Sequence, residues 1–288
     1  MSATNGGSRS RYARIDGHEV HYMEWGAAGA GEAARPALVM WHGLARTGRD
    51  FDWIARALSD AFHIICPDTI GRGLSEWSSA PDTDYCFDTY AKLARGLADA
   101  VGFETMHWLG TSMGGSLGMR VAATTLAGRI DKLIINDIGP TFPQAPFERI
   151  KAYVGNPPEF QTLSELEDYF KMIYEPFGPH TDAQWRHMAE TSSRRLPSGK
   201  FTTHYDPAIV RQMFVHPGDY ELWPHWDRIE SQTLVLHGVN SDLLLPEIAD
   251  EMTRRGPKAR VVEIEGCGHA PGLVVPEHIR VVRDFLLG

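Results

Sequence analysis

The six residues 110–115, Gly-Thr-Ser-Met-Gly-Gly, constrain the fold of this chain more than any other segment. They follow a short apolar run, residues 106–109, and a segment of helical character begins near Met113. A strand that leads directly into a helix needs a sharp turn, and the strained residue at its apex needs small neighbours on both sides. The glycines meet that need. The sequence therefore predicts a strand, a sharp turn and a helix, with Ser112 at the apex.

A serine in this position has the surroundings that a nucleophile requires. Its hydroxyl points away from the sheet, and the backbone N–H of Met113, at the start of the helix, faces the space where an oxyanion would form. A Gly-x-Ser-x-Gly match alone occurs by chance, so the rest of the chain has to decide. The same glycines do not form Gly-x-Gly-x-x-Gly and no Gly-Lys-Ser/Thr follows them, which disfavours a phosphate-binding loop.

Composition limits the kinds of partner that the protein can have. The length of 288 residues suits about two domains, or one large α/β domain with an insertion. The formal net charge of -9 argues against a general affinity for nucleic acid or for an anionic membrane, because both attract basic surfaces. We therefore expect a small-molecule substrate, with no nucleic-acid or membrane partner, and leave a homo-oligomer open.

Neither a disulfide framework nor a metal site is suggested by the residues that would form one. The three cysteines, Cys66, Cys86 and Cys267, have no Cys-x-x-Cys spacing, and no His/Asp/Glu cluster has the spacing of metal ligands. We expect no cofactor and no metal. Residues 1–10 are expected to be a flexible leader without the apolar stretch of a secretory signal, and no apolar run is long enough to span a bilayer. These features favour a cytoplasmic protein.

Short apolar runs alternate with helical patterns along most of the chain. Residues 11–15 and 19–25 flank Asp16-Gly17, a dipeptide typical of a tight β-hairpin. Beyond the hairpin, buried strands are predicted at 37–41, 62–66, 106–109, 132–136, 233–238 and 259–264, and helices at 50–58, 89–101, 246–255 and 276–287. This alternation predicts an α/β fold with a mostly parallel central sheet flanked by helices.

The alternation stops after the sixth strand and resumes about ninety residues later. Residues 139–226 are rich in proline and aromatic residues, and their patterned segments are helical, at 147–154, 163–174, 182–191 and 207–214. No buried-strand run interrupts them. We therefore expect an all-helical cap at 139–226, inserted into a core formed by 11–138 and 227–288.

A serine hydroxyl needs a base within hydrogen-bonding reach, and the base needs an acid to orient it. His269 lies in the loop after the last predicted strand, and Asp242 lies in the loop after the preceding one. Because the carboxyl ends of parallel strands meet at one edge of a sheet, Ser112, Asp242 and His269 are expected to meet there.

Nearly the whole chain resembles the α/β-hydrolase superfamily. The chain order Ser112, Asp242, His269 is that family's order of nucleophile, acid and histidine, and His42-Gly43-Leu44 resembles its oxyanion loop. Residues 68–75, Asp-x-x-Gly-x-Gly-x-Ser, resemble another recurring loop of the family. The resemblance implies that the Leu44 N–H is the second oxyanion donor beside Met113, and that residues 139–226 form a lid over the site. His42 and Asp68 are expected to hold backbone rather than to react.

The same resemblance leaves two candidates for the acid, since the family places it after either of two strands. Asp137, at the end of the sixth strand, could also reach His269. We prefer Asp242, because Ser-Asp-x-x-x-Pro resembles the usual acid loop, and we expect Asp137 to cap the exit into residues 139–226.

The resemblance predicts a serine hydrolase that cleaves small carboxylic esters or lactones through an acyl-enzyme. One alternative is hydrolysis of a carbon–carbon bond in ring-cleavage diketones, because enzymes of that type share the lid, the triad and Ser-Met-Gly-Gly. An alternative of another class is a ligand receptor that keeps the triad but has negligible turnover. Three arginines are candidates for holding a substrate carboxylate: Arg46, Arg72 and Arg120.

Overall fold

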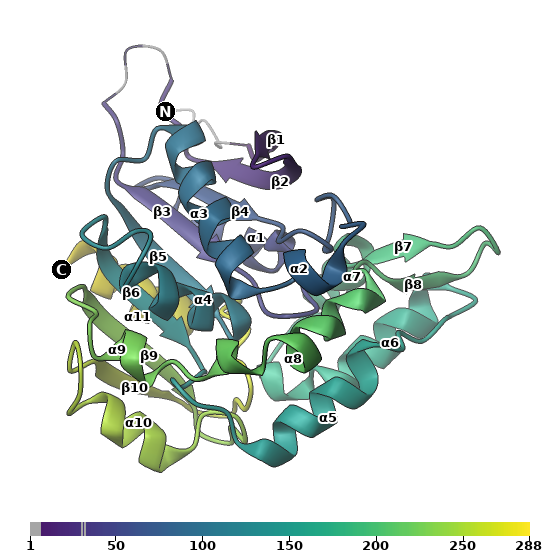
Figure 1. The fold of residues 1–288 in the computed structure, drawn as a ribbon. Helices are drawn as coiled ribbons and strands as arrows, with labels where there is room; N and C mark the ends of the chain where they lie inside the picture. The colour runs from purple at the N-terminus through teal and green to yellow at the C-terminus, as the bar shows by residue number, and fades with distance from the viewer. Residues whose placement is uncertain (1–6, 30, 32) are drawn as a thin grey trace.

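A central eight-stranded sheet organises the molecule (Figure 1). The computed structural model describes residues 7–29, 31 and 33–288. The spatial order of the strands is β1-β2-β4-β3-β5-β6-β9-β10. Strands β1 and β2 pair antiparallel, β2 pairs antiparallel with β4, and all other neighbours are parallel. The strands are β1 (Arg9–Ile15), β2 (His18–Trp25), β3 (Ala37–Trp41), β4 (His63–Pro67), β5 (Met106–Thr111), β6 (Ile130–Asn136), β9 (Gln232–Gly238) and β10 (Arg260–Ile264). The predicted α/β architecture is confirmed.

Helices cover both faces of this sheet, as the fully apolar strands require. Successive residues of β3 belong to opposite clusters: Val39 and Trp41 pack on one side, Leu38 and Met40 on the other. The first cluster includes residues of α3 (Phe87–Val101) and α4 (Met113–Ala122), and the second includes residues of α1 (Asp52–Leu58) and α11 (Pro276–Leu287).

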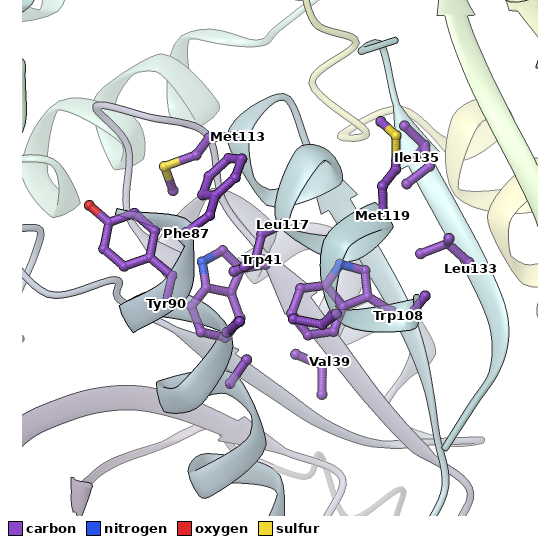
Figure 2. Close-up of a cluster of buried hydrophobic side chains, with 14 of the residues drawn as sticks. Val39, Trp41, Phe87, Tyr90, Trp108, Met113, Leu117, Met119, Leu133 and Ile135 are labelled. Carbon is purple, nitrogen blue, oxygen red and sulfur yellow. The ribbon is translucent and has the colours of Figure 1, made fainter. Parts of the chain in front are cut away.

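Figure 2 shows part of the first cluster, between the sheet and helices α3 and α4. Trp41 of β3 and Trp108 of β5 stack with their ring centroids 5.3 Å apart. The indole N–H of Trp108 donates a hydrogen bond to the Gly114 carbonyl, at 3.1 Å, in the first turn of α4. The core beneath the predicted serine turn is therefore both densely packed and bonded to the turn itself.

The start of the chain differs slightly from the expected leader. The leader was expected to extend to residue 10, but Arg9 and Ser10 already pair with β2. Residues 1–6 lie outside the described part of the chain. The hairpin turns at Asp16 and Gly17, which both have positive φ, 49° and 90°, as a two-residue hairpin of this type demands.

We call residues 139–226, between β6 and β9, the cap; the expectation that this segment is all helical is wrong. Its helices are α5 (Gln144–Val154), α6 (Leu163–Ile173), α7 (Asp182–Thr191), α8 (Arg211–Val215) and α9 (Trp223–Trp226). After α7, however, β7 (Ser193–Arg195) and β8 (Phe201–Thr203) form an antiparallel pair that projects from the cap (Figure 1). Strands of three residues contain too few alternations for a sequence pattern to reveal them.

The cap consists of two parts that pack differently. Helices α6 and α7 enclose a small cluster of their own, formed by Leu166, Phe170, Trp185, Met188 and Ala189. In contrast, the segment after β8 belongs to the main core, to which it contributes Tyr205, Ile209, Met213, Tyr220, Leu222 and Trp226. The second part is therefore anchored to the sheet domain, and the first lies over the carboxyl edge of the sheet.

Candidate active site

Ser112 lies at the apex of a sharp turn between β5 and α4, as its sequence predicts. Its φ of 52° and ψ of -116° are strained for a residue with a side chain. A Cβ on Gly110 would lie 2.1 Å from the Gly114 carbonyl oxygen, and one on Gly114 would lie 2.0 Å from that of Trp41. Both contacts are closer than any side chain allows, so only glycine lets strand and helix pass each other here.

His269 connects the serine to a buried aspartate. Its Nε2 lies 2.8 Å from Ser112 Oγ, and its Nδ1 lies 2.9 Å from Oδ2 of Asp137. A neutral imidazole that donates from Nδ1 to the carboxylate presents Nε2 as an acceptor for the serine hydroxyl. This is the tautomer that a general base for Ser112 needs.

The Asp137 carboxylate is fully buried, and several hydrogen bonds hold it in place. Oδ1 accepts from the Gly238 N–H at 2.7 Å, and Oδ2 accepts from the Ser241 hydroxyl at 2.6 Å as well as from His269. Asp137 itself has a positive φ of 56°, immediately after the end of β6. The chain turns there so that the side chain points along the carboxyl edge toward β9 and His269.

The prediction that Asp242 orients His269 is wrong. Its carboxylate forms an ion pair with Arg149 of α5, with Oδ2 2.7 Å from the Arg149 Nη1, and its side chain is 50% exposed. In the loop after β9, Ser241 turns inward to Asp137, and Asp242 faces the cap. Asp137, the second candidate from the sequence, takes its position, and the expectation that Asp137 merely caps the exit into the cap is also wrong.

Two elements hold the loop that carries His269. The Asn136 side-chain amide donates to the Pro271 carbonyl at 2.9 Å and to Thr111 Oγ1 at 3.0 Å, which connects the ends of β5 and β6 to this loop. From the cap, the Pro176 carbonyl accepts from the Gly268 N–H at 2.7 Å. The base is therefore positioned by the sheet and by the cap together.

The loop after β3 borders the serine on its other side. His42 is fully buried; its Nδ1–H donates to the Gly43 carbonyl at 2.7 Å, and its Nε2 accepts the Thr69 N–H at 2.9 Å. Burial lowers the pKa of His42 to about 4, so the ring is neutral near pH 7. A Cβ on Gly43 would lie 3.6 Å from that of Ser112, and Leu44 lines the same cavity as Ser112.

Asp68 has the structural role that was expected of it. Its Oδ1 accepts the Gly48 N–H at 2.7 Å, and its Oδ2 accepts the Leu74 N–H at 2.9 Å and a hydrogen bond from His21 at 2.8 Å. These bonds fix the loop after β4, in which the Thr69 N–H donates to His42.

A cavity of about 700 Å³ contains Ser112 and His269 in its wall. This volume is in the range of small-molecule sites. The cap contributes aromatic and aliphatic side chains from α5, α6, α7 and the residue that follows α6, namely Ile150, Tyr153, Tyr169, Ile173, Tyr174 and Met188. The site can therefore hold an apolar or moderately polar small molecule against the serine.

The three candidate arginines lie in different surroundings. Arg46 is buried in the wall of this cavity. Arg72 is buried below it and donates to the carbonyls of Leu44 and Ile70, so its role is structural. Arg120 pairs with Asp88 and Asp219, away from the cavity. Of these three candidates, Arg46 is the one that lines the cavity.

The described residues contain no group of three or more His, Cys, Asp or Glu side chains arranged to hold a metal ion. Within the same residues, no helix combines the length and the apolar character needed to cross a membrane.

Comparison with known proteins agrees with this geometry. Residues 38–282 match the model of the alpha/beta hydrolase family. The 3-hydroxybutyrate-oligomer hydrolase of Cupriavidus necator is 37% identical over 94% of this chain and 94% of its own. The N-formylmaleamate deformylase of Pseudomonas putida is 26% identical over 88% of this chain and 87% of its own. An alpha/beta hydrolase from Novosphingobium aromaticivorans superposes with a TM-score of 0.85 at 29% identity, covering 99% of both chains. The chain therefore belongs to the alpha/beta hydrolase family, and it is a hydrolase.

Proposed function

We propose that this protein is a serine hydrolase that cleaves small carboxylic esters, and that its substrates are short oligoesters of hydroxy acids. The observation that carries the proposal is the continuous hydrogen-bond chain from Ser112 through His269 to the buried Asp137, at the wall of a cavity of about 700 Å³. The substrate class is supported by the 37% identical relative, which is named a 3-hydroxybutyrate-oligomer hydrolase.

Acylation begins when Ser112 Oγ attacks the ester carbonyl carbon. His269 Nε2 takes the hydroxyl proton, and Asp137 stabilises the imidazolium that forms. The tetrahedral oxyanion accepts hydrogen bonds from the N–H groups of Leu44 and Met113. Such a donor contributes on the order of 3 kcal/mol to the transition state.

Collapse of the intermediate breaks the bond to the leaving oxygen. His269 returns its proton to that oxygen, the alcohol departs, and the acyl group remains on Ser112. A water molecule then gives its proton to His269 and attacks the acyl carbonyl. The acid leaves as Ser112 recovers its proton from His269.

The experiment is steady-state hydrolysis of p-nitrophenyl esters of graded acyl length and of the linear 3-hydroxybutyrate dimer. The wild type is compared with Ser112→Ala and with a matched control, Ser116→Ala. Ser116 lies one turn further along α4, fully buried, where its hydroxyl has no hydrogen-bond partner in the described part of the chain. We expect Ser112→Ala to lower kcat by at least about 10⁴-fold and Ser116→Ala to leave it nearly unchanged.

Two results would overturn the proposal. If the hydrolysis rate is the same in the wild type and in folded Ser112→Ala, the reaction does not pass through an acyl-enzyme on Ser112. Turnover of simple esters without any turnover of the dimer would leave the serine mechanism in place but remove the oligoester class.

A further inference from the structure

A part-buried ion pair lies in the wall of the catalytic cavity, and the mechanism above does not use it. Arg46 and Asp50 both line the cavity, and Arg46 is only 5% exposed. Arg46 Nε lies 2.8 Å from Asp50 Oδ2, and Nη2 lies 2.5 Å from Oδ1. This is the two-bond geometry in which guanidinium and carboxylate hold each other most firmly.

The rest of the Arg46 guanidinium is held by residues of the cap. Nη2 also donates to Ser192 Oγ at 3.1 Å, and the Tyr174 ring lies 4.6 Å from the guanidinium carbon. The Tyr174 hydroxyl contacts the guanidinium as well. Asp50 and Ser192 use Nε and Nη2, and the Tyr174 hydroxyl can accept only one of the two Nη1 hydrogens. Arg46 is therefore rigid, and it keeps donor capacity in the cavity wall.

The pair stands close to the reacting serine. A Cβ built on Gly43 would lie 3.6 Å from Ser112 Cβ and 3.7 Å from Cγ of Arg46, so the two side chains flank the same glycine. Ser112, Arg46 and Asp50 therefore line one cavity, and the stem of Arg46 lies beside the serine.

The charge of the pair determines what kind of group fits it. Burial alone would lower the pKa of Arg46, but the neighbouring Asp50 carboxylate raises it above its ordinary value, so the guanidinium stays charged. Its positive charge is balanced by the carboxylate that it binds. A substrate carboxylate at Nη1 would place a second anion beside Asp50, whereas a hydroxyl accepts from Arg46 and donates to Asp50 without adding charge.

The other two arginines of the cavity wall are less suited to selecting a ligand. Arg149 is exposed and paired with Asp242, and Arg49 donates to Asp52, which also binds His187. Charges that water reaches contribute little to recognition. Among the arginines of the wall, Arg46, paired with Asp50, is therefore the one on which substrate selection can depend.

We propose that Arg46 and Asp50 recognise a hydroxyl group on the acyl part of the substrate, so that the enzyme acts at the hydroxyl end of a hydroxy-acid oligoester. This inference rests on the proposed function and narrows it. An oligoester bound in this way delivers its terminal hydroxyacyl unit to Ser112, and the shortened oligomer leaves as the alcohol. The enzyme then releases one hydroxy acid in each turnover.

The test uses three forms of the linear 3-hydroxybutyrate trimer: free at both ends, O-acetylated at the hydroxyl end, or methyl-esterified at the carboxyl end. We expect acetylation to lower kcat/KM for release of the terminal unit by at least about 10-fold, because the acetyl group removes the hydroxyl that would donate to Asp50 and leaves the polar pair without its partner. Methyl esterification should change kcat/KM by less than about 2-fold. The opposite pattern, or no effect of either cap, overturns the inference.

A variant tests the residue itself. Asp50→Asn should lower kcat/KM for the free trimer while changing that for the acetylated trimer little, so that the preference for the hydroxyl end is lost. The matched control is Asp242→Asn, which lies in the same cavity wall and should keep the preference. If Asp50→Asn lowers both rates in parallel at an unchanged melting temperature, the pair has a structural role and the inference fails.

The trimer experiment also separates this inference from the proposed function. If the wild type hydrolyses none of the three trimers in a Ser112-dependent way, the oligoester function itself fails. If hydrolysis depends on Ser112 but is indifferent to acetylation, only the role of Arg46 and Asp50 fails. Because the capped trimers are compared on the wild type, the result does not depend on the variant folding.

Discussion

Asp137 and Asp242 follow neighbouring strands at the same edge of the sheet, yet they differ in burial and in their hydrogen-bond partners. Asp137 is fully buried and accepts hydrogen bonds from Gly238, Ser241 and His269. Asp242 is half exposed and has Arg149 as its ion-pair partner. A carboxylate that is buried and bonded on both oxygens is held in one orientation, whereas an exposed pair is screened by water. Burial and bonding, rather than position after a strand, distinguish the orienting acid.

The largest expected effect removes the charge of the buried aspartate. Asp137→Asn should lower kcat by about 10³- to 10⁴-fold, because an amide no longer holds His269 with its Nδ1 proton inward or stabilises the imidazolium. Asp242→Asn, the matched change on the exposed aspartate, should alter kcat by less than about 3-fold. Steady-state kinetics of both variants on one ester measures the two losses in kcat. Equal losses would show that Asp137 is not the acid that orients His269.

His42 extends the comparison to another buried polar side chain at this edge. Its pKa is about 4 in the folded protein and about 6.5 when unfolded, so below pH 6.5 the unfolded chain binds the proton more readily. The contribution of neutral His42 is therefore complete above pH 6.5 and is lost as the pH falls toward 4. Between pH 7 and pH 4.5, the free energy of unfolding of the wild type should fall by about 2 to 3 kcal/mol more than that of His42→Gln. Urea unfolding at the two pH values measures this difference. An identical loss in both proteins would contradict it.

A substitution at Ser241 tests how far the role of Asp137, as opposed to that of Asp242, depends on the hydrogen bonds that Asp137 accepts. Ser241→Ala removes the 2.6 Å donor to Asp137 and the hydroxyl that accepts from the Leu243 and Leu244 N–H groups. We expect a loss of about 1 kcal/mol in the free energy of unfolding and a fall in kcat of roughly 3- to 10-fold. Chemical denaturation and kinetics measure the two quantities. An unchanged kcat would mean that His269 alone is enough to hold the carboxylate.

The smallest effect is expected at the exposed pair. Arg149→Gln should change the free energy of unfolding by less than about 0.5 kcal/mol, since Arg149 and Asp242 are both about half exposed. Melting temperatures at low and high salt would check this. A loss of several degrees that disappears in high salt would show that the pair holds the cap in place.

The sheet and the serine turn could be predicted from the sequence because their signals are local. Buried strands are continuous apolar runs between glycine and proline, as at 37–41, and only glycine permits the contacts at Gly110 and Gly114. The β7–β8 pair was missed because its three-residue strands carry no period. The split of the cap between two clusters depends on long-range packing, which no local pattern records.

The choice of acid could not be made from spacing. Both aspartates follow strands whose carboxyl ends meet, so spacing does not separate them, and the Ser-Asp-x-x-x-Pro resemblance favoured Asp242, which is the wrong one. The outcome depends on the positive φ at Asp137, which directs its side chain along the edge, and on Ser241 turning inward beside it. Arg149, the partner that holds Asp242 outward, is more than ninety residues away in the chain and lies in the cap.

Proton NMR can observe the Nδ1 proton of His269, which the structure places between the imidazole and Asp137. An imidazole proton that donates to a buried carboxylate resonates far downfield of the amide region and exchanges slowly with water. We predict such a resonance in the wild type and in Asp242→Asn, and its loss in Asp137→Asn. A resonance that persists in Asp137→Asn and disappears in Asp242→Asn would contradict the account.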